Sequence, residues 1–390
     1  MNTVTTSFLL FSIKISVFLL FVSFSTLAID IEKLRALYDQ PSEFWPPAEI
    51  DEGIHAKEIG LLEKISFPKE NSFTEEKLRL GEQLFHDGRL SRSQQIACVS
   101  CHDSDLGWGD GRRTSFGHNL QKGKRNAPTI ENVGYGKHFF WDGRAATLEQ
   151  QALMPLQDPV EMNFTLPELE ERLSQIPEYK KAFKAAFGDE NITAKKIGQA
   201  LATYQRTIVS RLSRFDLFLM ATAKNVKSDE KKKNLKMSDQ AILGMHLFRT
   251  KARCMNCHNG PTFSDQKLHN IGLTYYKRKY QDFGQYNVTK NPNDVGKFKT
   301  PSLRGVMNNK PWMHNGLFSN MRGLLNLYNG GVSRPKKDPN DPLSPVTSKL
   351  IKPLLLTKEE ILALEEFLKA ITAPPALGPS RKYIQLIDEN

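Results

Sequence analysis

The amino-acid sequence predicts a mainly α-helical protein made of two similar units, with long loops and few strands. Three observations predict this fold class. The five-residue pattern C-x-x-C-H occurs twice, at Cys98–His102 and at Cys254–His258. A shorter pattern, L-G-x-x-L-F, precedes each of them and begins at Leu80 and at Leu243, so the chain contains an internal repeat. No long segment alternates apolar and polar residues between hairpin turns, as the strands of an antiparallel sheet do.

Each C-x-x-C-H pattern is the attachment signature of a c-type haem. Two thiols bond to the porphyrin, and the histidine that follows them binds the iron. The two patterns use all four cysteines of the chain. The residues that would hold the two groups are Cys98, Cys101, His102, Cys254, Cys257 and His258. Zinc sites, redox-active cysteine pairs and disulfides are the competing interpretations. A histidine directly after each pair favours two covalently bound haem c groups in two cytochrome-c-like domains.

Helices are expected where apolar residues recur at helical spacing, in residues 72–86, 193–210 and 357–371. The glycine of each L-G-x-x-L-F pattern allows two helices to cross closely, and its phenylalanine fills space against a haem edge. Residues 103–140 and 259–300 are rich in Gly, Asn and Lys and show little periodicity. Ordered loops of this length are uncommon unless they surround something, and a haem gives them something to surround.

The N-terminus predicts secretion. Residues 1–28 contain an apolar stretch and end in Thr26-Leu27-Ala28, a small-residue cleavage site, so they resemble a signal peptide. An uncleaved membrane anchor is the competing interpretation. Because bacteria attach haem to C-x-x-C-H outside the cytoplasmic membrane, we expect a periplasmic protein. The lysine-rich stretch 224–236 is expected to link an N-terminal domain (29–235) to a C-terminal domain (236–390).

Charge and composition describe an ordinary globular chain with a basic excess. Hydrophobic residues make up 39% of the chain and charged residues 25%, and the formal net charge is +11. An excess of this sign attracts an acidic redox partner, or it is simply a lysine-rich solvated surface. No nucleic-acid-binding motif is present.

Six further motifs follow the first C-x-x-C-H in a fixed order. They are S-F-G-H at 115–118, R-N-A-P-T at 125–129, F-W-D-G-R-A at 140–145, E-M at 161–162, F-K-T-P-S-L-R at 298–304 and M-H-N-G at 313–316. Together they resemble the bacterial dihaem cytochrome c peroxidases and their relative MauG. The resemblance extends from about residue 75 to residue 372. It implies that hydrogen peroxide is reduced at the first haem, with electrons from a small cytochrome c or cupredoxin.

The resemblance also implies roles for individual residues of the first site. His118, sixteen positions after His102, matches the histidine that caps the peroxidatic haem in the resting enzyme. Glu161 and Gln151 match the family's distal glutamate and glutamine, and a buried carboxyl can accept and return the proton that peroxide cleavage requires. Trp141 matches the tryptophan between the two haems. The competing interpretation is a large aromatic residue of the hydrophobic core.

The second site is ambiguous in sequence. Typical peroxidases have a methionine ligand fourteen positions after the histidine of M-H-N-G, and that count from His314 reaches Tyr328. MauG has a tyrosine at the matching place. Asn126, Asn309 and Pro311 match positions that hold a calcium ion through oxygen ligands. Family members are often homodimers, but no interface is visible in this sequence.

Two other functions stay open at this stage. A MauG-like enzyme would use peroxide to oxidise residues of a partner protein, which Tyr328 favours and His118 disfavours. A dihaem electron carrier without peroxidase activity would need neither Glu161 nor Gln151.

Overall fold

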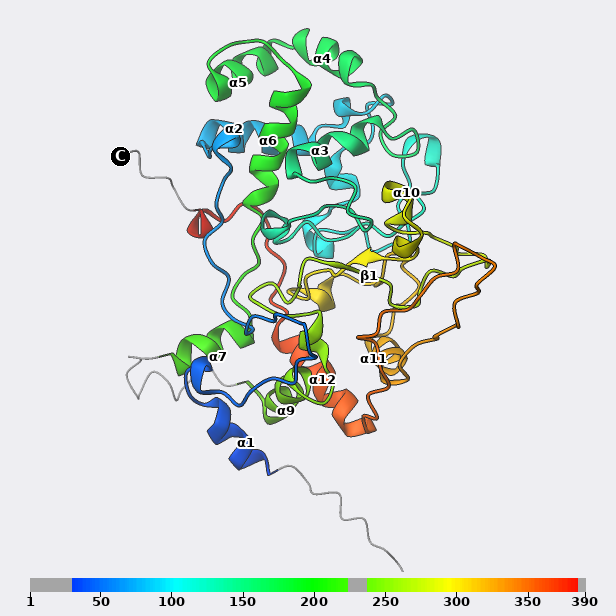
Figure 1. The fold of residues 1–390 in the computed structure, drawn as a ribbon. Helices are drawn as coiled ribbons and strands as arrows, with labels where there is room; N and C mark the ends of the chain where they lie inside the picture. Colours follow the sequence, from blue (N-terminus) through cyan, green and yellow to red (C-terminus); the bar gives the residue numbers. More distant parts are fainter. Residues whose placement is uncertain (1–29, 224–236, 385–390) are drawn as a thin grey trace, which may run out of the picture.

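A computed structural model describes residues 30–223 and 237–384 of the 390-residue chain. The predicted signal peptide and the whole lysine-rich stretch 224–236 lie outside the described residues. Within the described part the chain is mainly helical, and its one sheet pairs two strands of two residues each (Figure 1). These strands are β1 (Leu268–His269) and β2 (Phe298–Lys299), antiparallel with Leu268 opposite Lys299. The predicted fold class is confirmed.

Three helices lie close to the positions that periodicity predicts, and a threonine caps the start of each; α6 ends at Arg206, four residues before the predicted end. Thr74, Thr193 and Thr357 each accept a hydrogen bond from the backbone of the first turn and so begin α2, α6 and α12. The helices are α1 (Ile31–Tyr38), α2 (Glu75–His86), α3 (Leu148–Gln157), α4 (Leu166–Ser174), α5 (Pro177–Phe187), α6 (Ala194–Arg206), α7 (Arg214–Thr222), α9 (Asp239–Arg249), α10 (Tyr286–Thr289), α11 (Met321–Asn329) and α12 (Lys358–Ala370).

Two hydrophobic cores organise these helices. The first core is formed by buried side chains between Leu78 and Ile208, from α2 to α6. The second is formed by α9, α11 and α12, together with buried residues of α1 and α7. We call the parts of the chain around them the first unit and the second unit. In Figure 1 the first unit lies above the second, with β1 between them.

The internal repeat is a repeated helix crossing. A Cβ atom placed on Gly81 of α2 would lie 2.0 Å from the carbonyl oxygen of Ala200 in α6. A Cβ atom on Gly244 of α9 would lie 1.9 Å from the carbonyl oxygen of Ala363 in α12. Only glycine permits helices to approach this closely, so the prediction of close crossings is confirmed at both copies.

The cores show where individual helices belong. Tyr38 and Trp45 in the N-terminal arm, and Phe215 and Phe218 of α7, pack into the second core although they precede residue 236. The predicted domain division at 235 lies in the stretch that is not described, and it stays a prediction.

Candidate active site

Both C-x-x-C-H patterns fold into the same turn. In the first, the amide N–H groups of Cys101 and His102 both donate to the carbonyl oxygen of Cys98, at 3.1 Å. In the second, Cys257 and His258 donate in the same way to the carbonyl of Cys254, at 3.1 and 2.7 Å. The turn therefore holds two sulfur atoms and one imidazole on a short rigid segment in each unit.

Each histidine of these patterns is oriented by a backbone carbonyl. Nδ1 of His102 lies 3.1 Å from the carbonyl oxygen of Trp108, and Nδ1 of His258 lies 2.9 Å from that of Phe263. Because a carbonyl only accepts, Nδ1 carries the proton and Nε2 keeps its lone pair. Burial lowers the pKa of both imidazoles, which keeps them neutral. A neutral, oriented imidazole is a suitable metal ligand.

The four cysteines are half-buried, and their thiols stay protonated. Burial raises the pKa of Cys98, Cys254 and Cys257 to about 12 and that of Cys101 to about 11. The thiolate is the form of cysteine that is oxidised and binds metals, so thiols that stay protonated do neither readily. This environment suits sulfur atoms that end as thioethers.

A cavity of about 250 Å³ lies in the first unit, and Glu161 lines it together with Arg144, Met154, Pro155, Gln157 and Asp158. The Glu161 side chain is exposed to this space, while protein atoms around the cavity remove most of the water from its carboxyl. Burial, followed by the charge of Asp158, raises the pKa of Glu161 to about 7, against the opposing effect of Arg144. The Glu161 charge also raises the pKa of Cys98 and Cys101, so this carboxyl lies close to the first pair of thiols.

The loop that carries His118 is attached to the segment that carries Glu161. The amide of His118 donates to the carbonyl oxygen of Glu161 at 2.8 Å. A Cβ atom on Gly117 would lie 2.1 Å from the carbonyl oxygen of Val160, so glycine is required for this contact. The structure therefore brings His118 and Glu161 together, and movement of one segment must disturb the other.

Several buried polar atoms near the patterns have no hydrogen-bond partner. In the described part of the chain these atoms are Thr114 Oγ1, His118 Nδ1, Gln151 Oε1, Arg253 Nε, His314 Nε2 and Asn315 Nδ2. Buried polar groups are nearly always paired, so such atoms mark places where a bound group completes the pairing. Together with the thiols and the oriented histidines, they fit a haem in each unit.

Trp141 lies between the two units. Its indole N–H donates to the carbonyl oxygen of Asn126 at 2.9 Å, and its own carbonyl accepts from the amide of Lys299 at 2.8 Å. Its ring meets that of His314 edge-on at 6.4 Å, and His314 in turn stacks on Phe298 at 3.6 Å. Burial lowers the pKa of His314 to about 4, so this imidazole is neutral. The arrangement is a column of aromatic rings that crosses from one unit to the other.

Tyr328 faces the second pair of thiols from α11. Burial raises its pKa, and the charges of Cys257 and Cys254 raise it further, so the phenol lies near both sulfur atoms. The methionines that compete with it in sequence belong to the same unit: Met321 is buried in the second core, and Met307 and Met313 pack against that core, as Tyr328 does.

The residues predicted to hold calcium are engaged in protein contacts. The side-chain amide of Asn126 donates to the carbonyl of Arg112 at 2.8 Å, and that of Asn309 donates to the carbonyl of Gly107 at 3.1 Å. Pro311 is partly buried. In the described residues no cluster of three His, Cys, Asp or Glu side chains surrounds them, so the calcium site stays a prediction.

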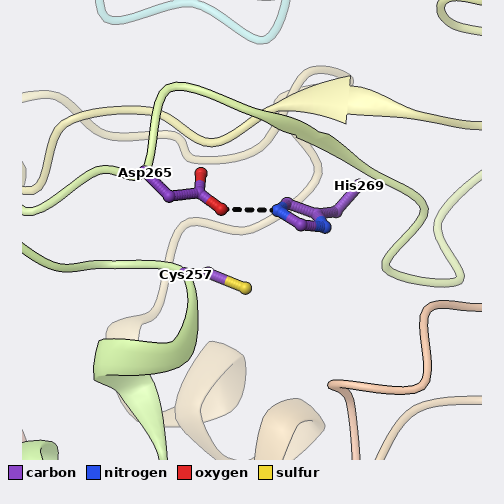
Figure 2. A group of neighbouring side chains, drawn as sticks. All are labelled: Cys257, Asp265 and His269. Atoms are coloured by element: carbon purple, nitrogen blue, oxygen red, sulfur yellow. Dashed lines mark hydrogen bonds and ion pairs between the residues drawn. The ribbon is translucent and has the colours of Figure 1, made fainter. Parts of the chain in front are cut away.

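The cluster of metal-binding side-chain types that does occur in the described residues is Cys257, Asp265 and His269, whose ligand atoms lie within 4.8 Å of one another. Figure 2 shows the imidazole and carboxylate paired above the sulfur atom, with Nε2 2.7 Å from Oδ2. Cys257 belongs to the second C-x-x-C-H, the pattern that predicts attachment of its sulfur to a porphyrin. The cluster therefore belongs to the second haem site.

Sequence reasoning missed one residue of this region, Lys299. Burial lowers the pKa of its ammonium group to about 8, and it forms no ion pair with a described carboxylate. Lys299 is half-buried, and a cation without a protein partner suits the carboxylates that haem carries. Its place inside F-K-T-P-S-L-R is the signal that could have identified it.

Comparison with known proteins agrees with this geometry. The family model described as di-haem cytochrome c peroxidase matches residues 75–224. The cytochrome-c peroxidase IdrP1 of a Pseudomonas species is 37% identical over 344 residues, which cover 80% of this chain and 85% of that protein. The methylamine utilization protein MauG of Methylorubrum extorquens is 36% identical over 320 residues, covering 80% and 83%. The crystal structure of a MauG-like protein associated with microbial copper homeostasis has a TM-score of 0.69 at 30% identity, and the match covers 80% of this chain and 93% of that one.

The chain therefore belongs to the di-haem cytochrome c peroxidase family, whose members include proteins named MauG. Membership implies two haem c groups and a peroxidase-type oxidoreductase fold. None of the described helices has the length and apolar character needed to cross a membrane.

Proposed function

We propose that this protein is a periplasmic peroxidase that reduces hydrogen peroxide to water at the first C-x-x-C-H site. One peroxide, two protons and two electrons give two waters, so each turnover needs two one-electron donations. A small cytochrome c or cupredoxin supplies them, and the second unit relays them. When bound, haem supplies an iron that exchanges electrons with peroxide, whereas protons must be moved by side chains.

The observation that carries this proposal is the position of Glu161. Its carboxyl lies near the first pair of thiols, opens onto a cavity and has a pKa of about 7. Such a group can take a proton from one peroxide oxygen and return it to the other. Gln151, whose Oε1 atom is buried without a partner, would accept a hydrogen bond from peroxide and orient it.

The remaining residues of the first site have supporting roles in this proposal. His102 would hold the iron, and His118 would cover it in the resting protein and leave before peroxide binds. The hydrogen bond from His118 to the Glu161 carbonyl would break in that movement. Opening the site and repositioning the acid–base group are then one event. Trp141, in the aromatic column between the units, would carry electrons between the haems.

The test is Glu161→Gln, which keeps the size of the side chain and removes its acid–base chemistry. We expect the rate of peroxide reduction to fall by about 10²–10⁴-fold, with haem content and the resting optical spectrum unchanged. Glu171→Gln on the exposed face of α4 is the matched control and should keep full activity. Equal peroxide-reduction rates in both variants would show that Glu161 is not the acid–base group, and absence of peroxide reduction by the wild-type protein itself would contradict the peroxidase assignment and favour a dihaem electron carrier.

A second candidate function follows from Tyr328. An anionic oxygen ligand stabilises ferric iron and higher oxidation states, whereas a thioether raises the potential. Tyr328 beside Cys254 and Cys257 therefore favours the MauG-like alternative, an enzyme that oxidises residues of a partner protein. Poor peroxide turnover with every reduced redox protein, together with oxidation of a co-purifying protein, would support this candidate over the first.

A further inference from the structure

A group of stacked cations and aromatic rings covers one part of the surface where the two units meet. We call it the basic patch and define it by the cations Arg112, Arg113, Lys122, Arg278 and Lys279 and the rings Phe116, Tyr275 and Tyr280. Apart from the charge of Arg112, which opposes the raised pKa of Cys101, neither the proposed chemistry nor the haem sites use these side chains.

The first half of the patch lies on the loop that carries His118. Phe116 is 41% exposed, and it lies between two cations: Arg112 Cζ is 5.5 Å and Lys122 Nζ is 5.3 Å from the ring centre. Phe116 and Lys122 form an antiparallel bridge, and the amide of Gly123 donates to the carbonyl of Ser115 at 2.9 Å. The loop is a closed hairpin, so Phe116 and its cations occupy defined positions.

The second half comes from the second unit. Tyr280 lies between Arg113 and Lys279, whose charged ends are 5.3 and 5.6 Å from its ring centre. Tyr275 meets Tyr280 edge-on at 5.9 Å and is itself covered by Arg278 at 4.9 Å. Because Arg113 follows Arg112 directly, the two halves form one continuous surface across the boundary between the units.

The positive charge of the patch is not compensated by the chain. None of the five cations forms an ion pair with a described carboxylate, whereas the neighbouring Lys277 pairs with Asp341 at 2.8 Å. Arg125, just outside the patch, pairs with Asp142 and Asp282 at 2.5 and 2.7 Å. The side chain of Asp110 accepts from the backbone amide of Arg112 and forms no ion pair with the patch. Arg112, Lys122, Arg278 and Lys279 are exposed, and Arg113 is half-buried and donates to the carbonyl of Asn315 at 3.4 Å, so at least four charges of the +11 excess face solvent within one area.

We propose that the basic patch is the docking surface for an acidic redox protein that donates electrons to this enzyme. The inference rests on the proposed peroxidase function and names the charge of its donor. Uncompensated cations raise the local concentration of an acidic partner and speed its association. Exposed aromatic rings and arginines are the residues that supply binding energy in the centre of transient interfaces.

The geometry favours a protein over a nucleic acid. Single-stranded nucleic acids bind by stacking bases on free aromatic faces. Phe116, Tyr275 and Tyr280 are each covered by at least one cation of this chain, which leaves their edges and the cationic groups to contact a partner. Carboxylates on a protein surface suit this combination.

The position of the patch connects docking with the state of the first site. Phe116 and His118 belong to the same hairpin, and His118 is hydrogen-bonded to Glu161. A partner seated on Phe116 would contact the segment that has to move before peroxide binds. Each donor molecule delivers one electron and leaves oxidised, so two dockings serve each peroxide.

The experiment compares charge-reversal variants of the haem-loaded protein. Arg278→Glu/Lys279→Glu changes the half of the patch that is remote from His118, and Arg112→Glu/Lys122→Glu changes the other half. Lys180→Glu/Lys181→Glu is the matched control, because both lysines are exposed on α5, which lies away from α10 and the patch side of the molecule in Figure 1. The probes are an acidic monohaem cytochrome c and, for comparison, a basic one.

At low ionic strength we expect kcat/KM for the acidic cytochrome to fall at least about ten-fold in each patch variant, within the range of electrostatic steering. The loss should shrink as salt is raised to about 0.5 M, where exposed charges are screened. The control variant should match the wild type, and the basic cytochrome should show no loss in the patch variants. Circular dichroism of each variant establishes that it is folded.

Two outcomes would overturn the inference. One is an unchanged kcat/KM for the acidic cytochrome in both patch variants; the other is patch-dependent binding of a single-stranded oligonucleotide that exceeds binding of the acidic cytochrome. Peroxide turnover by the wild-type protein with a small uncharged reductant distinguishes failure of the proposed function from failure of the docking surface. If that turnover is absent, the proposed function fails; if it is present and the variants behave like the wild type, only the docking surface fails.

Discussion

At the scale of single residues, the two C-x-x-C-H sites differ in the side chain that lies near their thiols. The first pair is close to the carboxyl of Glu161, and the second pair is close to the phenol of Tyr328. A carboxyl with a pKa of about 7 exchanges protons at neutral pH, whereas burial keeps the phenol protonated unless a metal takes its place. Identical attachment segments therefore support different chemistry.

Tyr328 can be tested by two substitutions. Tyr328→Met would replace an oxygen ligand with a thioether, and Tyr328→Phe would remove the ligand. Because axial ligands set haem potentials over about 0.8 V, we expect the potential of the second haem to rise on the order of 0.1 V with methionine. Optical and EPR spectra of the oxidised and half-reduced protein, with a redox titration, measure the change.

The matched control for this pair is Tyr286→Phe, which removes a hydroxyl from α10 and should leave both haem spectra unaltered. Spectra and potentials that stay unchanged in both Tyr328 variants would show that Tyr328 is not a ligand.

At the scale of elements, the repeated helix crossing holds each unit together. α2 meets α6 at Gly81, and α9 meets α12 at Gly244, with no room for a Cβ atom at either glycine. The same helices carry Phe85 and Phe248, which are fully buried and meet the rings of Trp108 and Phe263 at 6.2 and 5.9 Å. A change in the crossing would therefore reach the segments that follow the two patterns.

Gly81→Ala and Gly244→Ala should each destabilise the protein. The added methyl group would push apart two backbones, and overpacking of this kind costs about 1–3 kcal/mol or more. Gly323→Ala in α11 is the control, because a Cβ atom there would have its nearest neighbour at 3.8 Å; it should be neutral or slightly stabilising. Denaturant midpoints of the haem-loaded proteins measure the difference, and equal midpoints for all three variants would refute the crossing as a constraint.

At the scale of the whole molecule, polar contacts lock the two units together. Arg125 of the first unit pairs with Asp282 of the second. The indole N–H of Trp108 donates to the carbonyl of Ala376 at 2.7 Å, and the amide of Ala376 donates to Glu131 at 2.9 Å. The backbone carbonyl of Trp108 also accepts from Nδ1 of His102 and so orients that imidazole. The segment after α12 therefore contacts the residue that orients His102.

Glu131 makes this contact dependent on pH. Burial raises the pKa of its carboxyl from 4.5 to about 7, against the opposing effects of the Ala376 amide and of Arg211 and Arg304. Below pH 4.5 this carboxyl is protonated in both the folded and the unfolded state, so it costs no free energy of folding. As the pH rises through 7, ionisation favours the unfolded state, and the folded state is progressively destabilised. Relative to a neutral side chain, the loss is on the order of 2–3 kcal/mol above pH 8.

Glu131→Gln keeps the acceptor for Ala376 and removes the titration. We expect the variant to match the wild type near pH 4.5 and to be more stable at pH 8.5, as measured by guanidinium unfolding at several pH values. Glu171→Gln, exposed on α4, should show no such pH-dependent difference. A stability gap that is constant with pH would show that Glu131 is ionised throughout.

The sequence by itself determined the attachment chemistry, the repeat and the family. C-x-x-C-H is recognisable because its residues act together within one turn, and the crossing glycines are recognisable because each lies in a repeated local pattern. The starts of α6 and α12 lie next to the predicted positions 193 and 357 because capping acts over three or four residues, whereas α2 begins after Thr74 and not at the predicted residue 72.

Only the tertiary structure decided what depends on distant parts of the chain. The packing of Tyr38 and Phe215 into the second core, the pKa of Glu161, the half-buried Lys299 and the joining of Arg113 to Tyr280 all arise from residues far apart in sequence. Burial and charge act through space, so a local pattern carries no record of them. The chain specifies where a haem is attached, and the fold specifies which groups meet it.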